Sequence, residues 1–455
     1  MTIIKTSKII LPALLLAALI FNSVLSNNAS AQWKVQTRDS LYNFNDVEFI
    51  NVYTGWVIGN NGKIFKTQDG GYHWHQQLNN SPVNNLQRIH FPSQSVPGNT
   101  GYIIGYVDNS LPNAGVLLET NDSGYIWQDV WLRNFYYMKD VQFFNPYTGF
   151  IIGGRDSTSS LGYILKTTNG GFGATTTLTI DTVLNFGIFK TLSFINTNTG
   201  YVCAVDSNKN STIIKTLNSG GDWFIKSHLS NIDIHQMQFL SELTGFAVGG
   251  GYNGAGAKIL KTTNGGVNWS VQTFGMDGNY FNGISFAYDR GRWRGWVCGE
   301  NGNVYNTTNL GVTWYKQAAP EGFIQNLNGI CFLDLDHGWS SGNSGGVVST
   351  YTGGDPTSSI SPINGNIPTK YNIAQNYPNP FNPETNIKFS IPENSLVRIS
   401  VYNSLGQIIE NLVNERLSAG EYVTKFHGEA LSSGIYFYTI SAGSYNKTMK
   451  MLLVK

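Results

Sequence analysis

Three charged residues occupy the same place in successive segments of the sequence, one residue ahead of a predicted apolar strand. They are Asp46, Arg88 and Asp140. Two carboxyl groups about 5–10 Å apart can act as acid and base in glycoside hydrolysis, and an arginine can bind a substrate carboxylate through paired hydrogen bonds. The two acids belong to segments that are not adjacent, with the arginine between them. This order favours a partly neutralised, solvated rim over a catalytic pair, and glycan hydrolysis stays the alternative.

Four further segments carry an uncharged residue at the same place: Thr191, Gln236, Gly283 and Gly329. The sequence contains no Gly-rich phosphate loop between a strand and a helix, no His/Cys cluster at metal-ligand spacing and no nucleophile elbow. We therefore predict no catalytic residue, no metal site and no cofactor.

Two aromatic clusters near these positions could stack on sugar rings. They are Phe135-Tyr136-Tyr137 and Tyr280-Phe281. The residue three positions before each predicted strand is apolar in all seven segments, which predicts a core role for Phe281. Tyr137 and Tyr280 remain candidate ligand contacts.

The seven segments are copies of one repeat, which contains the phrase Thr-x-Asp/Asn-x-Gly-x-x-Trp. The acid or amide can accept backbone N–H groups and the glycine can adopt a positive φ, so the phrase predicts a tight turn before an outer strand. Five copies are complete: Thr67, Asp69, Gly71, Trp74; Thr120, Asp122, Gly124, Trp127; Thr216, Asn218, Gly220, Trp223; Thr262, Asn264, Gly266, Trp269; and Thr307, Asn309, Gly311, Trp314.

A second phrase, glycine followed by an aromatic residue, sets the length of the repeat. From Gly55 to Gly338 there are 283 residues in six steps. The resulting average of about 47 residues fits the ~40–50-residue period of four-stranded propeller blades. The sequence therefore predicts an all-β fold, with a seven-bladed β-propeller over residues 32–352.

Two copies are incomplete. The third has Ala174 in place of the tryptophan, and the seventh, which ends near Thr352, has no fourth strand. The segment Trp33-Lys34-Val35-Gln36-Thr37 resembles the outer strand Trp269-Ser270-Val271-Gln272-Thr273. We expect residues 33–38 to complete the seventh blade, because a closed ring leaves no open sheet edge.

The repeated turn resembles the Asp-box, or BNR repeat, and the whole unit resembles the propellers of the photosystem II assembly and stability factor family. The resemblance covers residues 32–352 and implies a β-propeller. Family members in photosynthetic cells assist reaction-centre assembly. Asp-box propellers also include sialidases and other glycoside hydrolases, so the resemblance leaves both binding and hydrolysis open.

The connections between the second and third strands of each blade predict a recognition face. They are long only in blades two to five, on the face where the chain enters each inner strand, whereas the Asp-box turns are expected on the opposite face. The predicted residues for an unidentified protein or glycan ligand are Arg88, Tyr106, Asp108, Asp140, Arg155, Asp156, Asp206 and Tyr252. The alternative is that these loops are tolerated insertions.

The N-terminus predicts export. Lys5 and Lys8 precede an apolar run that ends near Phe21, and Ala29-Ser30-Ala31 forms a small-residue cleavage site, so residues 1–31 have the pattern of a signal peptide. The run is shorter than the ~20 residues of a transmembrane helix, and we expect none in the mature chain. With 29 Lys and Arg against 28 Asp and Glu, nucleic acid is not an expected partner.

The three cysteines, Cys203, Cys298 and Cys331, each lie in an apolar strand-like run. We predict buried thiols, with a disulfide as the alternative.

The C-terminal part changes composition. Residues 353–370 are rich in Gly, Ser, Pro and Asn and predict a linker. Beyond them, Val397, Ile399 and Val401 alternate with polar residues, which predicts a small immunoglobulin-like β-sandwich over residues 371–455.

This tail resembles the type A sorting domain of the bacterial type IX secretion system. The matching phrases are NYPNPFNP from Asn376, VYNSLG from Val401, SGIYFY from Ser433, and the closing Lys450-Met451. The resemblance implies that residues 371–455 engage the type IX machinery, that the protein crosses the outer membrane from the periplasm, and that the tail is then removed. An ordinary immunoglobulin-like adhesive module is the alternative.

Together these features predict a secreted or cell-surface propeller that acts as a non-catalytic binding module. A sialidase-like glycoside hydrolase and a structural adhesion protein are the alternatives.

Overall fold

The computed structural model describes residues 33–37, 41–77, 85–92, 100–107, 115–132, 137–154, 161–170, 179–184, 186–251, 256–272, 278–289, 291–320, 322–354, 361–364, 368–417, 419–428 and 431–455. These residues form β-strands joined by turns, with one 3₁₀ turn, η2 (Glu300–Gly302), so the predicted all-β class is confirmed. The strands make nine four-stranded antiparallel sheets within the described ranges. Gln32–Asp355 forms one compact unit and Pro356–Lys455 belongs to another.

Seven sheets lie in the unit Gln32–Asp355, and six of them are built from four consecutive strands. These are β2 (Phe44–Phe49), β3 (Gly55–Gly59), β4 (Ile64–Thr67), β5 (His75–Gln76); β6 (Asn85–His90), β7 (Gly101–Tyr106), β8 (Gly115–Thr120), β9 (Gln128–Leu132); β10 (Tyr137–Phe143), β11 (Gly149–Gly154), β12 (Gly162–Thr167), β13 (Thr179–Leu184); β14 (Ile188–Phe194), β15 (Gly200–Val205), β16 (Ser211–Thr216), β17 (Phe224–Leu229); β18 (Ile232–Phe239), β19 (Gly245–Gly251), β20 (Ala257–Thr262), β21 (Ser270–Gln272); and β22 (Phe281–Asp289), β23 (Arg292–Gly299), β24 (Val304–Thr307), β25 (Tyr315–Lys316).

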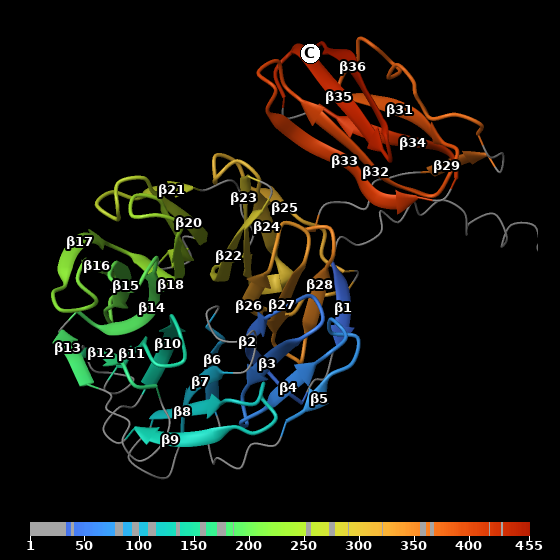
Figure 1. Cartoon of the computed structure of the whole chain (residues 1–455). Coiled ribbons are helices and arrows are strands. Elements are labelled where there is room, and N and C mark those ends of the chain that lie inside the picture. Colours follow the sequence, from blue (N-terminus) through green and yellow to red (C-terminus); the bar gives the residue numbers. More distant parts are fainter. Residues whose placement is uncertain are drawn as a thin grey trace, which may run out of the picture. The chain divides into compact units, whose positions relative to one another are not determined.

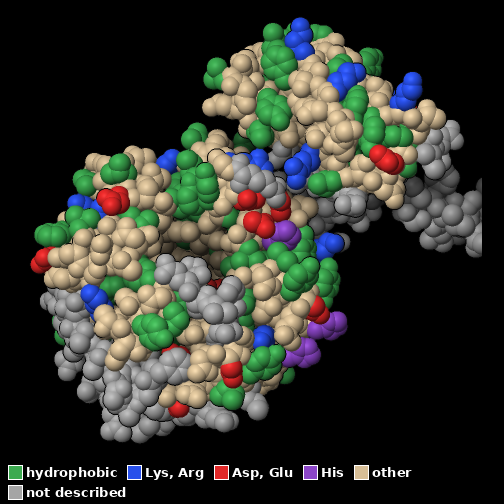
Figure 2. Space-filling view, in the orientation of Figure 1, with side chains coloured by type: hydrophobic (Ala, Val, Ile, Leu, Met, Phe, Trp, Pro, Cys, Tyr) green, Lys and Arg blue, Asp and Glu red, His purple; other side chains and the backbone are tan. Residues whose placement is uncertain are grey.

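The seventh sheet joins the two ends of this unit. It combines β26 (Leu327–Phe332), β27 (Gly338–Gly342) and β28 (Val347–Thr350) with β1 (Lys34–Thr37), which pairs antiparallel to β28 (Figure 1). The seven innermost strands contact one another in order, and β26 contacts β2. The sheets therefore stand in a ring, whose centre is hollowed on the face shown in Figure 2.

Aromatic stacking joins each sheet to the next. The phenylalanine near the end of an inner strand lies flat on the aromatic residue that follows glycine in the preceding sheet. The ring centroids are 3.4–4.4 Å apart in the seven pairs Trp56–Phe91, Tyr102–Phe143, Phe150–Phe194, Tyr201–Phe239, Phe246–Phe286, Trp296–Phe332 and Trp339–Phe49. The same contact occurs at all seven junctions, including the one between the seventh sheet and the first.

The same phenylalanine explains why the second phrase begins with glycine. A Cβ atom on Gly55 would lie 2.4 Å from the ring of Phe49, and the six equivalent glycines show the same approach. No side chain fits there without displacing the ring. In the Gly-aromatic phrase, the glycine thus leaves room for the phenylalanine ring of its own sheet. The aromatic residue that follows stacks on the phenylalanine of the next sheet.

The Asp-box tryptophan meets the same phenylalanine edge-on. The interplanar angles are 76–89° in Trp74–Phe49, Trp127–Phe91, Trp223–Phe194, Trp269–Phe239 and Trp314–Phe286. In the seventh sheet, Trp33 takes this place, 5.7 Å from Phe332 at 84°. Trp33 is 1% exposed, and its indole N–H donates to Gln317 Oε1. The N-terminal segment thereby provides the tryptophan that the seventh copy lacks.

The Asp-box turns have one hydrogen-bond pattern. Thr67 Oγ1 donates to Asp69 Oδ1 and accepts the Gly71 N–H, while Asp69 Oδ1 also accepts the N–H of His73. Gly71 has φ +101°, in the left-handed region, as predicted. The other four complete turns repeat the threonine–glycine bond. Ala174 of the third copy lies outside the described residues.

The positions predicted to rim the channel instead join neighbouring sheets. Asp46 Oδ2 accepts the N–H of Ile89, and Asp140 Oδ2 accepts the N–H of Leu192, each in the next sheet. Thr191 and Gln236 make the same kind of bond to the following sheets. Asp46, Asp140 and Thr191 are thus buried and bonded across the sheet junctions, which differs from the solvated rim expected at this position.

Arg88 lies between the two acids. Its guanidinium is 3.5 Å from Asp46 Oδ1 and 3.9 Å from Asp140 Oδ1. Burial raises the pKa of Asp46 to about 6 against the opposing charge of Arg88, and burial also raises the pKa of Asp140. The three charges serve the junctions between the first sheets of the ring.

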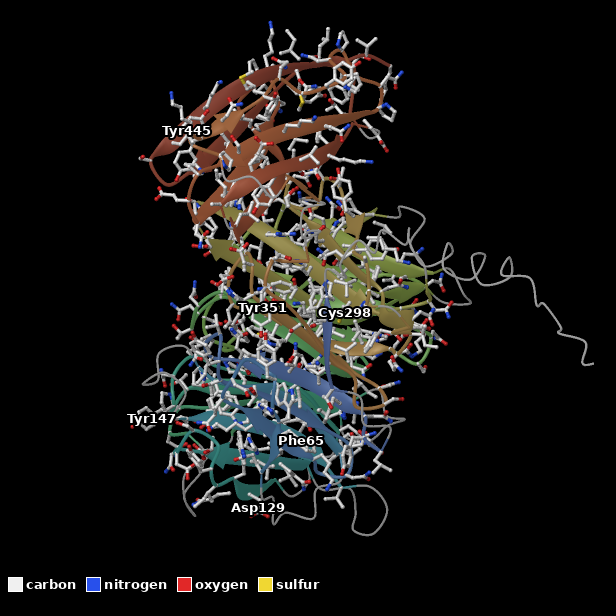
Figure 3. The ribbon with its side chains drawn as sticks, turned by 90° about the vertical axis from the view of Figure 1, so that its right-hand side faces the viewer. Phe65, Asp129, Tyr147, Cys298, Tyr351 and Tyr445 are labelled. Carbon is white, nitrogen blue, oxygen red and sulfur yellow. The ribbon has the colours of Figure 1, made fainter. Side chains whose placement is uncertain are left out.

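The three cysteines are free thiols, with Cys203 and Cys298 buried and Cys331 half-buried. Burial raises the pKa of each to about 12, so these thiols are poor nucleophiles. Figure 3 places Cys298 among the strands of the ring.

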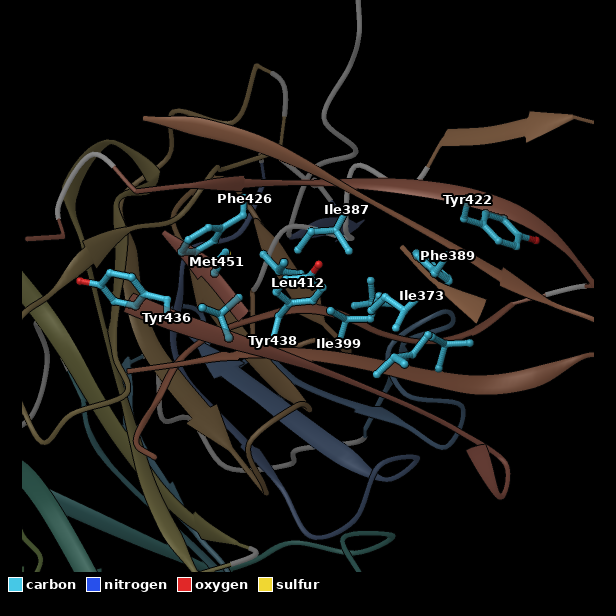
Figure 4. Close-up of a cluster of buried hydrophobic side chains, with 14 of the residues drawn as sticks. Ile373, Ile387, Phe389, Ile399, Leu412, Tyr422, Phe426, Tyr436, Tyr438 and Met451 are labelled. Carbon is cyan, nitrogen blue, oxygen red and sulfur yellow. The ribbon is translucent and has the colours of Figure 1, made fainter. Parts of the chain in front are cut away.

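The unit that contains Pro356–Lys455 has two sheets with one shared core. One sheet has the order β29 (Ser361–Asn364), β34 (Gly420–His427), β31 (Glu384–Ile391), β30 (Asn372–Ile373); the other has β33 (Ile408–Leu417), β32 (Ser395–Tyr402), β35 (Gly434–Ala442), β36 (Tyr445–Leu453). Buried side chains from both, such as Phe389 and Ile399, fill the space between them (Figure 4).

Strand β29 corrects the predicted linker of residues 353–370, because Ser361–Asn364 pairs with β34. The strand contains Pro362 and lies at the sheet edge, the place where proline is tolerated in a sheet. The loop-like composition therefore hid a short edge strand.

We predict that Trp33→Ala destabilises the ring by about 3–5 kcal/mol, the usual cost of removing a buried tryptophan side chain. Urea unfolding of the mature protein, followed by tryptophan fluorescence and circular dichroism, measures the change. Lys34→Ala, at an exposed position of the same strand, is the control and should be close to neutral. Equal stability of the two variants would contradict a closing role for Trp33.

We also predict a pH-dependent effect of Asp46→Asn. The folded state raises the pKa of Asp46 to about 6, so it binds the proton more tightly than the unfolded chain and this carboxyl lowers stability as pH rises from about 4. Asparagine cannot ionise. The stability of the variant relative to the wild type should therefore increase by up to about 3 kcal/mol between pH 4 and 8. A pH-independent difference in unfolding free energy would contradict the assignment.

Candidate binding face at the mouth of the ring

Each innermost strand carries a β-bulge at the same place, directly after its buried apolar residue. In β2, for example, Phe44 pairs with Gly59 and Asp46 with Ile58, which leaves Asn45 as the extra residue. The register shifts at the equivalent place in the other six strands. The extra residues are Asn45, Gln87, Lys139, Lys190, His235, Asn282 and Asn328. A bulge re-aims the side chain. All seven extra residues are polar and half-buried, and they lie in the first half of their inner strands; we call this end of the ring, where the chain enters the inner strands, the mouth.

Three of the amides on this ring join neighbouring sheets. The Nδ2 group of Asn45 donates to Leu86 O, that of Asn282 to Leu327 O, and that of Asn328 to Phe44 O, at 2.6–2.9 Å. Each acceptor is the buried apolar residue of the next sheet. A neutral amide is thus sufficient for the junction at this position.

The third, fourth and fifth sheets carry basic residues here instead, namely Lys139, Lys190 and His235. Lys190 Nζ binds Asp233 Oδ1, and Lys209 Nζ, from the loop after β15, lies 2.9 Å from Asp233 Oδ2. His235 Nε2 is 3.6 Å from the same oxygen. Only the acid is deeply buried: its side chain is 3% exposed, against 24% for Lys190 and His235 and 40% for Lys209.

The electrostatics keep Asp233 ionised. Although burial raises the pKa of Asp233, the neighbouring His235 and the charge of Lys190 hold it well below the usual range. The carboxylate therefore fixes the positions of two ammonium groups at the mouth, and the lysines outnumber the acid in this cluster.

Aromatic rings flank the basic residues. Tyr280 stacks on the imidazole of His235, with centroids 5.0 Å apart and planes 7° apart. On the other side, Tyr106 and Tyr137 lie 4.8 Å apart, and Lys139 Nζ is 5.6 Å and 5.9 Å from their centroids. Half-buried rings beside cations form a rigid surface suited to binding.

The predicted ligand residues divide into three groups. Tyr106 lies at the mouth, as do the candidate contacts Tyr137 and Tyr280, whereas Arg88 and Asp140 lie deeper and join sheets. Asp206 accepts the N–H groups of Asn208 and Asn210 and so shapes its own loop. Asp108, Arg155, Asp156 and Tyr252 lie outside the described residues. Phe281 is fully buried, as predicted.

Sequence reasoning missed Lys190, Lys209 and His235. One sequence feature could have indicated them: in every inner strand, a polar residue directly follows the position that is always apolar. A regular strand would point that residue to the face opposite its neighbours, and only a bulge brings it to the mouth.

The described residues contain no group of three His, Cys, Asp or Glu side chains arranged to hold a metal ion. Over the same ranges, no helix has the length and apolar character needed to cross a membrane. The side chains on and beside the bulges offer ammonium, imidazole, amide, phenol and carboxylate groups.

Comparison with known proteins agrees with the fold. The chain is 24% identical over 313 residues to the chloroplast photosystem II stability/assembly factor HCF136 of Arabidopsis thaliana, covering 66% of this chain and 73% of that protein. The solved structure "YCF48 bound to D1 peptide" matches with a TM-score of 0.55 at 19% identity, over 72% of this chain and 98% of that one. A GH74 enzyme of Niastella koreensis matches with a TM-score of 0.50 at 12% identity, over 93% of this chain and 75% of that one. At such identities the solved structures support the fold alone.

Two family models match the chain. The secretion system C-terminal sorting domain matches residues 375–455, which indicates export through the type IX system. The other model matches residues 25–351, which is most of the chain and includes all seven sheets of the unit Gln32–Asp355. The protein thus belongs to the family of the photosynthesis system II assembly factor YCF48.

Proposed function

We propose that the protein is a secreted or cell-surface, seven-bladed β-propeller that binds a partner at the mouth of its ring without catalysis. Its immunoglobulin-like tail, residues 371–455, directs export by the type IX machinery and is then removed. The mature protein is released or held at the cell surface.

One observation carries the binding role. The mouth presents cations and aromatic rings on strands of a closed scaffold, where little conformational entropy is lost on binding. Lys190, His235 and Tyr280 all stand on or directly beside inner strands.

The relatives support a peptide or protein as the partner. The curated relatives carry the name of assembly factors, and one solved YCF48 structure is described as bound to a D1 peptide. A propeller exported to the cell surface would meet a different partner, so the likeness supports the mode of binding and not the identity of the ligand.

Glycoside hydrolysis is the second candidate, favoured by the fold likeness to a GH74 enzyme. Against it, Asp46 and Asp140 are each bound by a backbone N–H of the next sheet, and Arg88 lies between them. A catalytic acid and base need free access to the glycosidic oxygen and to water. A purely structural adhesion protein is the third candidate and predicts no specific partner at the mouth.

We predict that the double variant Tyr106→Ala/Tyr280→Ala loses partner capture with an unchanged melting temperature. The measurement is crosslinking pull-down from the producing cells with the mature protein as bait, followed by mass spectrometry. The matched control is Tyr72→Ala/Tyr125→Ala, which removes two tyrosines that are 66% and 62% exposed on Asp-box turns. Partner loss in the control but not in the mouth variant would reject the assigned face.

We further predict that deletion of residues 371–455 leaves the propeller in the periplasm. The tail belongs to a separate compact unit, so the ring should still fold. Cell fractionation with immunoblotting locates the protein, and fusion of residues 356–455 to a periplasmic reporter is the positive control. Normal amounts of the truncated protein in the medium or at the surface would refute the sorting role.

A further inference from the structure

We propose that Lys190, Lys209 and His235, together with Lys139, bind the carboxylates of an acidic peptide segment at the mouth of the ring. The inference rests on the proposed function, since it names the chemistry of the ligand that the same face would hold. It concerns a binding site built by three neighbouring sheets.

The first argument compares one backbone position around the ring. Asn45, Asn282 and Asn328 show that a neutral amide at the bulge can bond to the next sheet. The third to fifth sheets have Lys139, Lys190 and His235 at this place, and each of them also bonds to a side chain of a neighbouring sheet. Ordering long charged side chains costs entropy and solvation, so the junction alone does not require them. Their charge has another use.

The second argument is the geometry around Asp233. This one carboxylate holds Lys190 and Lys209 from two different segments, and the imidazole of His235 is within 3.6 Å. In this cluster two lysines share one carboxylate. Among the described residues, the ammonium of Lys190 bonds only to Asp233, which leaves donors for a bound anion. A second carboxylate placed above the two lysines would form charge-assisted hydrogen bonds.

The spacing of the cations favours a peptide over a compact anion. Lys139, Lys190 and His235 stand on consecutive sheets, so they suit carboxylates spread along an extended chain. Tyr280 and Tyr137 flank them and can contact the aliphatic parts of acidic side chains. Nucleic acid would require a wider basic surface, whereas Asp206 lies in the same loop as Lys209 and the chain has a net charge of only +1.

The test is fluorescence anisotropy with a labelled, end-blocked hexaglutamate peptide and the mature protein at low salt. We expect saturable binding to hexaglutamate and none to hexaglutamine. Lys190→Asn should weaken binding at least tenfold, since a charge-assisted hydrogen bond is lost. The new asparagine can donate to Ile234 O, as its counterparts do in other sheets, but the change also removes one ammonium partner of the buried Asp233, so the melting temperature is measured beside the affinity.

Lys209→Gln provides a second variant on an exposed loop and should also weaken binding at least tenfold. Lys34→Asn, at an exposed position of β1, is the matched control and should bind as the wild type does. Unchanged affinity in both Lys190→Asn and Lys209→Gln, or equal binding of hexaglutamine, would overturn the inference. Tighter binding of oligogalacturonate than of hexaglutamate would overturn it in favour of an acidic glycan.

The two levels of the hypothesis can fail separately. If partner capture is lost in Tyr106→Ala/Tyr280→Ala but retained in both lysine variants, the mouth binds a partner through other chemistry and the acidic-peptide inference is rejected. If neither set of variants affects capture, the proposed binding face is rejected with it.

Discussion

The stacked aromatic pair at each sheet junction is the contact on which the ring depends. Each phenylalanine lies against a glycine of its own sheet, stacks on an aromatic ring of the preceding sheet and, where the Asp-box is complete, meets the edge of its tryptophan. Such pairs contribute about 0.5–1.5 kcal/mol beyond the burial of their area. Because each sheet contacts mainly its two neighbours, a gap at one junction would leave two sheet faces without a partner. This explains why the N-terminal segment must supply Trp33.

With the ring held by its aromatic junctions, the inner strands are free to differ in their polar residues. Asp46, Asp140, Thr191 and Gln236 are chemically different, yet each accepts a backbone N–H from the next sheet. The junction needs an acceptor at that position and little more. Charged residues near the axis are therefore weak evidence for catalysis, because an aspartate and a threonine perform the same structural task there.

Much of the fold could be predicted from the sequence because its determinants are local and repeated. The Thr-x-Asp/Asn-x-Gly turn folds on its own hydrogen bonds, and the glycine beside Phe49 has a single steric reason. The mouth could not be predicted, because the bulge at Asn45 or Lys190 reverses the direction that strand alternation implies. Strand β29 was missed for a different reason: its pairing partner β34 lies about sixty residues away and leaves no mark on local composition.

Because of the bulge, core packing and bonding to the next sheet fall to two different residues. The buried residue before it, such as Phe189, fills the core, and the residue after it, Thr191, bonds to the next sheet. Lys190 between them is left unpaired by the ladder and faces the mouth. Its Nζ bonds to Asp233 of the next sheet, whereas Asn45, Asn282 and Asn328 bond to a backbone carbonyl from the same place, so this position accepts different residue types while the ring stays the same. The basic residues of the third to fifth sheets are therefore where this protein's own specificity is expected to lie.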